Sequence, residues 1–108
     1  MKNKKDAFKE MIEFIKIEKK LGKETITKEE VELVKKLADK KRYPRAEYVL
    51  AIMYLKGYGV TKDKEMAINY LDRSSKRANC ELQLKIAYIY YVLDEDENES
   101  NDWLDKMR

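Results

Sequence analysis

The sequence predicts an all-α protein, a short right-handed α-solenoid of about three antiparallel helix pairs. Three observations support this prediction. Charged residues make up 42% of the chain, whereas glycine occurs 3 times and proline once, a balance that favours helices over strands. Apolar residues recur at steps of three and four. Several positions also repeat along the chain with the period that is typical of helical-repeat solenoids. We expect one domain over residues 1–108, with pairs at roughly 5–42, 44–77 and 79–108.

The first pair begins with an amphipathic helix over residues 5–21 that ends near Gly22, a suitable left-handed cap. Its apolar positions are Phe8, Met11, Ile12, Ile15 and Leu21. A second helix starts in I-T-K-E-E-V, where Thr27 and Glu30 have the spacing of a capping box. Ile26 and Val31 are placed as its hydrophobic staple. The expected inner side holds Val31, Val34, Leu37 and Ala38.

The second pair begins at Pro44, which is suited to the first turn of a helix because no donor is needed there. That helix runs to Lys56. Gly57 and Gly59 then allow positive φ angles, so that the chain can reverse its direction within a few residues. Val60 fills the space between the two helices. Asp63 or Thr61 caps a fourth helix, whose apolar positions are Met66, Ala67, Tyr70 and Leu71.

The third pair consists of a fifth helix over residues 79–93 and a short sixth over residues 100–107. Sliding the sequence by one repeat matches second-pair residues to this pair: Ala46 to Cys80, Leu50 to Leu84 and Tyr54 to Tyr88. A slightly shorter shift, which fits a shortened loop between the paired helices, matches Y-L-D-R (70–73) to W-L-D-K (103–106). A repeat of this kind indicates that each pair buries its apolar face against its neighbours.

The segment A-E-Y-V-L-A-I-M-Y-L-K-G-Y-G-V-T-K-D-K-E-M-A-I-N-Y-L-D-R-S-S resembles the Sel-one-like repeat family, which is related to the tetratricopeptide repeats. The matching positions are Ala46, Leu50, Tyr54, Gly57, Gly59, Val60, Asp63, Ala67 and Tyr70. One full repeat, about a third of the chain, matches the family pattern. The flanking pairs depart from it, as terminal repeats of solenoids commonly do.

The resemblance implies a protein interaction module without intrinsic catalysis. In the tetratricopeptide layout, the first helix of each pair lines a concave face that can receive a partner helix or peptide. The candidate partner-binding residues are Arg45, Tyr48, Ile52, Lys56, Leu82, Ile86, Ile89 and Tyr90. The alternative is that so short a solenoid closes on itself and buries several of these residues as core.

Enzymatic chemistry, a metal site and a cofactor are not expected. The chain has no histidine, and its one cysteine, Cys80, lies in an apolar-periodic run that favours a buried structural role. The acidic segment Asp94–Asp105 has oxygen-bearing side chains at EF-hand spacing. However, Glu99 stands where that loop needs glycine, so a solvated acidic loop is the preferred interpretation.

The expected partner is another protein, bound by a small adaptor or by an inhibitor of the phage anti-defence or immunity type. The alternative is nucleic-acid binding through the basic half, since residues 1–45 carry 15 Lys and Arg against 9 Asp and Glu. A homodimer through solenoid ends could use Trp103, Leu104 and Met107. We expect a cytoplasmic protein without a membrane partner, because no apolar run approaches the length of a span.

Overall fold

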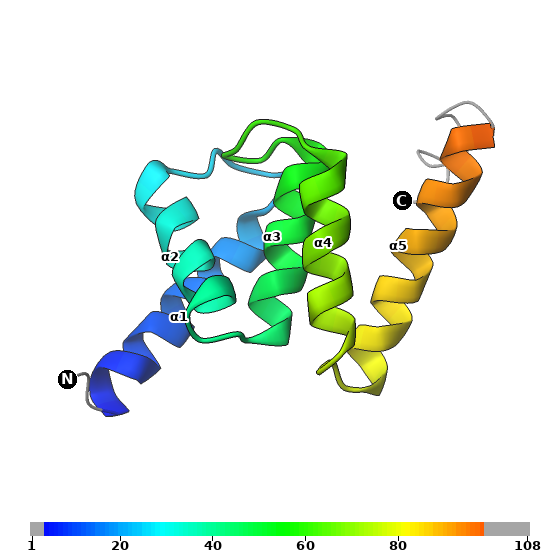
Figure 1. The fold of residues 1–108 in the computed structure, drawn as a ribbon. Coiled ribbons are helices and arrows are strands. Elements are labelled where there is room, and N and C mark those ends of the chain that lie inside the picture. The colour runs from blue at the N-terminus through cyan, green and yellow to red at the C-terminus, as the bar shows by residue number, and fades with distance from the viewer. Residues whose placement is uncertain (1–3, 99–108) are drawn as a thin grey trace. The chain divides into compact units, whose positions relative to one another are not determined.

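The structure, a computed structural model, describes residues 4–98, and within this range the chain is all-α, without a strand. The five helices are α1 (Lys4–Lys20), α2 (Lys28–Asp39), α3 (Pro44–Lys56), α4 (Lys64–Ser75) and α5 (Cys80–Asn98) (Figure 1). The chain falls into two units, Met1–Arg77 with α1 to α4 and Ala78–Arg108 with α5. The expected all-α class is confirmed for the described residues.

Local signals set the helix ends of the first unit. Thr27 caps α2 by accepting a hydrogen bond from the Glu30 N–H, while the Thr27 N–H donates to the Glu30 carboxylate. Asp63, rather than Thr61, caps α4 by accepting from the Met66 N–H at 3.0 Å. These bonds satisfy backbone donors that the first helical turn leaves without intrahelical partners. The capping box predicted from the sequence is therefore confirmed.

Helices α3 and α4 form an antiparallel pair, and α2 packs on α3. The rings of Tyr54 and Tyr70 stack across the pair with centroids 6.0 Å apart, and the Ser74 hydroxyl donates to the Pro44 carbonyl at 2.7 Å. The buried apolar residues of the pair are Ala46, Val49, Leu50, Ala51, Met53, Ala67, Tyr70 and Leu71. Small residues in this set let the two helix backbones approach closely.

A network of charged side chains joins α2, α3 and α4. Glu47 on α3 is only 1% exposed, and its Oε2 accepts a hydrogen bond from Arg73 Nε at 3.1 Å. Arg73 also forms an ion pair with Asp39 at 3.3 Å and lies over the Tyr70 ring. The Tyr70 hydroxyl donates to Asp39 at 2.8 Å. Because a buried carboxylate is costly without a cation, this network makes the three helices mutually dependent.

Helix α1 packs on α2 through a face other than the one its first apolar residues suggest. Phe14 and Ile17 are buried, whereas Phe8, Ile12 and Ile15 are exposed. Two long-range ion pairs accompany this orientation, Glu10 with Lys36 at 2.6 Å and Glu18 with Arg45 at 2.9 Å. The helix thus has apolar residues on two faces, and within the described residues of the first unit only one of these faces is used for packing.

Helix α5 runs to Asn98, beyond the end at Leu93 that is expected from the sequence. The repeat alignment that matches Tyr54 to Tyr88 places Tyr91 and Leu93 where the second pair has Gly57 and Gly59, so this helix meets no glycine that would end it. The acidic segment proposed as a loop therefore begins as helix, at Asp94. The expected sixth helix, with Trp103, lies outside the described residues.

Candidate functional site

The first half of the predicted concave face lies along α3. Arg45, Tyr48, Ile52 and Lys56 follow one side of the helix, and all except Arg45 are half-buried. Arg45 is already engaged, because its guanidinium forms two hydrogen bonds of 3.0 Å with the Glu18 carboxylate of α1. Burial raises the pKa of Tyr48, the negative charge of Glu18 adds to the rise, and Arg45 opposes it. This face is therefore partly occupied by the protein's own first helix.

The second half of the predicted face lies on α5, in the second unit. Leu82 and Ile86 are buried, whereas Ile89 and Tyr90 are half-buried.

Cys80, expected to be buried, is exposed instead. It is the first residue of α5, directly after Asn79, whose side chain accepts a hydrogen bond from the Leu82 N–H at 2.9 Å. A residue in the first turn of a helix can face solvent even inside an apolar-periodic run, which explains the error. Among the described residues, no group of acidic residues and cysteine is arranged to hold a metal ion.

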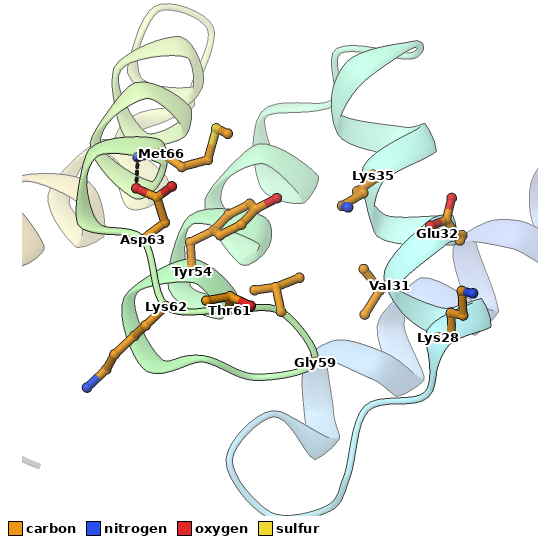
Figure 2. A pocket seen from close by; sticks show the side chains of 11 residues that line it. Lys28, Val31, Glu32, Lys35, Tyr54, Gly59, Thr61, Lys62, Asp63 and Met66 are labelled. Carbon is orange, nitrogen blue, oxygen red and sulfur yellow. Dashed lines mark hydrogen bonds between the residues drawn. The ribbon is translucent and has the colours of Figure 1, made fainter.

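A hollow that sequence reasoning did not predict lies between α2 and the α3–α4 hairpin (Figure 2). It has a volume of about 590 Å³ and is open to solvent. Its walls come from three elements and a loop: Lys28, Val31, Glu32 and Lys35 of α2, Tyr54 of α3, Met66 of α4, and residues 59–63. We call this site the α2–α4 hollow.

The glycine loop builds one wall of the hollow. The N–H groups of Gly57 and Tyr58 both donate to the Met53 carbonyl, at 2.7 and 2.9 Å, which closes the end of α3. Gly59 has a φ of +73°, and a Cβ placed there would lie 2.7 Å from Cγ2 of Val31. The Asp63 N–H then donates to the Tyr54 carbonyl at 2.9 Å. The loop is thus held at both ends and rests directly on α2.

The hollow combines an apolar floor with unpaired cations. Val31 and the Tyr54 ring point into it, and the Lys35 side chain extends toward Tyr54 (Figure 2). Lys35 forms no ion pair with any described residue, nor do Lys28 and Lys62 at the rim. By contrast, Lys36, the next residue of α2, is bound to Glu10. An apolar side chain with a carboxylate close to it would satisfy both features of this site.

The signal that could have located the hollow is the pair of glycines, because it indicates a close approach of two backbones. The sequence does not indicate which element the loop approaches, since Val31 and Gly59 lie far apart in the chain.

Comparison with known proteins does not identify a site or a family: no family model, no curated protein and no solved structure matches the chain. Within the described residues, no helix is long and apolar enough to cross a bilayer.

Proposed function

We propose that this protein is a non-catalytic protein-binding module, built as a short solenoid of the Sel-one-like repeat type. The observation that supports this function is the α2–α4 hollow, with an apolar floor and the unpaired Lys35. Its size suits one or two side chains of a partner rather than a whole domain. An adaptor or inhibitor of this kind acts by occupying its partner's surface.

The hollow is preorganised for such a partner. Tyr54 is fixed by its stack on Tyr70, and Tyr70 by its hydrogen bond to Asp39. The opposite wall is held by the loop contact with Val31. A site whose walls are already ordered loses little conformational entropy when a ligand binds, so a small contact area can still give useful affinity.

Affinity capture with two matched variants tests the proposal. Met66→Glu places a carboxylate in the hollow, at a residue 38% exposed. Tyr43→Glu makes a similar change at a residue 37% exposed, at the opposite end of α3. We expect the wild type and Tyr43→Glu to retain one stoichiometric protein partner after nuclease treatment, and Met66→Glu to lose it. Equal capture by all three would exclude the hollow as the binding site.

The same experiment addresses nucleic-acid binding through the basic half of the chain. That alternative predicts that the captured material disappears after nuclease treatment and falls steeply with salt, because phosphate contacts release counterions. It also predicts no difference between Met66→Glu and Tyr43→Glu. The narrower proposal of an inhibitor requires in addition that the captured partner loses an activity when bound.

A further inference from the structure

Helix α1 carries an apolar stripe on a side that its own unit leaves uncovered. Phe8, Ile12 and Ile15 follow one another at steps of four and three residues, which places them on one helical face. They are 68%, 39% and 44% exposed, although the same helix buries Phe14 and Ile17. Large exposed apolar residues that are contiguous on one face indicate a contact surface.

The charges around this stripe are almost all positive. Lys4 and Lys5 lie one turn before Phe8, and Lys16 and Lys19 lie one turn after Ile12 and Ile15. Lys4, Lys5, Lys9 and Lys19 are exposed and form no ion pair with another described residue. Lys16 has only a long contact of 3.9 Å with Glu13.

Glu10 and Glu18, two of the four acidic residues of α1, do not balance these lysines, because the packed side of the helix uses them. Glu10 is bound to Lys36, and Glu18 to Arg45. Folding thus separates the charges of α1. These two carboxylates turn toward α2 and α3, while the lysines remain around the apolar stripe. Much of the excess of positive charge in residues 1–45 is therefore concentrated on one side of one helix.

We propose that this face of α1 docks on an anionic lipid bilayer surface. An apolar stripe bordered by lysines is the pattern of helices that lie in the membrane interface, where apolar side chains enter the headgroup boundary and lysines approach lipid phosphates. The long lysine stems let the ammonium groups reach those phosphates while the stripe is immersed. This mode needs no spanning segment, so the expectation of no membrane partner, which rested on the absence of a span, does not bear on it.

Vesicle flotation of the full chain tests the proposal, with phosphatidylcholine vesicles compared with mixed phosphatidylcholine and phosphatidylglycerol vesicles. We expect binding at least about tenfold tighter to the anionic vesicles. Lys5→Gln and Lys19→Gln should each lower the affinity for anionic vesicles by about fivefold. The double variant Phe8→Ser with Ile12→Ser keeps every charge, and its affinity for anionic vesicles should fall roughly tenfold or more. Circular dichroism checks that each variant keeps its helix content.

The chain offers a closely matched control on α5. Leu84 and Tyr88 are 68% and 41% exposed and also four residues apart, but they belong to α5 and not to the lysine-bordered face of α1. Leu84→Ser with Tyr88→Ser should therefore bind anionic vesicles as the wild type does. Equal binding to both vesicle types would overturn the proposal, as would binding that is insensitive to the Phe8 and Ile12 replacements. Absence of vesicle binding would also overturn it and would favour an acidic protein surface as the partner of this face. None of these results would affect the hollow, whose test is separate.

Discussion

The loop between α3 and α4 contains two glycines with the same backbone conformation and different surroundings. Gly57 and Gly59 have φ angles of +76° and +73°. A Cβ at Gly57 would meet only ordinary contacts, the nearest being the Val60 carbonyl at 3.6 Å. A Cβ at Gly59 would lie 2.7 Å from Val31 Cγ2 and 3.1 Å from Ile26 Cβ. Replacing each glycine with alanine therefore separates backbone strain from steric overlap.

The expected magnitudes differ by about a factor of three. A left-handed conformation costs an alanine about 1 kcal/mol relative to glycine. Gly57→Ala should lose about that amount of unfolding free energy. Gly59→Ala adds overpacking of about 2 kcal/mol, because Val31 and Ile26 are buried and their branched side chains have few alternative rotamers. Its total loss should be about 3 kcal/mol.

Urea unfolding followed by far-UV circular dichroism measures both values. In thermal unfolding, the corresponding decreases in Tm should be about 5 °C and about 15 °C. Val31→Ala makes room beside residue 59. The double variant Val31→Ala with Gly59→Ala should therefore lose less unfolding free energy than the two single variants lose in sum. Equal losses for Gly57→Ala and Gly59→Ala would refute the close packing of the loop on α2.

Three further predictions concern the caps and the charge network. Thr27→Ala removes the side-chain acceptor of the α2 capping box and should cost about 1 kcal/mol in urea unfolding, while Thr27→Ser should stay near the wild type. Glu47→Ala removes the buried partner of Arg73 and should cost about 3 kcal/mol; Glu32→Ala, at an exposed site, should change stability by less than about 0.5 kcal/mol. A similar loss for both would contradict the network. Burial, together with the hydrogen bond to Asp39, raises the pKa of Tyr70 from 10.0 to about 12. Since the folded state disfavours the phenolate, Tyr70 makes its whole contribution to the free energy of unfolding below pH 10. This contribution falls as the pH rises toward about 12. Unfolding midpoints over this range should fall more steeply for the wild type than for Tyr70→Phe, and parallel slopes would count against the shift.

The sequence predicted the elements of the first unit because local chemistry determines them. A capping box needs only residues three positions apart, and Thr27 with Glu30 forms it as expected. Pro44 begins α3, and Gly57 in the left-handed region ends it. The end of α5 was predicted less well, because it depends on what replaces the glycines. With Tyr91 at the position equivalent to Gly57, no local signal marks the end of the helix.

The orientation of α1 could not be predicted from periodicity. Phe8, Ile12 and Ile15 have helical spacing, and so do Phe14 and Ile17 on another face. The structure selects the second face, with ion pairs between residues 26 and 27 positions apart, such as that of Glu10 with Lys36. Pairings over such distances leave no pattern in a single sequence. The hollow was missed for the same reason, since its walls come from separate elements.

The two candidate surfaces of the first unit are supported in different ways, and this affects how each should respond to mutation. The hollow depends on Tyr54, whose ring stacks on Tyr70, and Tyr70 is tied to Asp39. Loss of Glu47 should therefore weaken binding at the hollow through the network as well as lowering stability. The stripe on α1 depends on a helix held by Phe14, Ile17 and its own ion pairs. Because these supports share no residue with the network, Glu47→Ala should reduce partner binding at the hollow at temperatures where the protein stays folded, and leave vesicle binding unchanged.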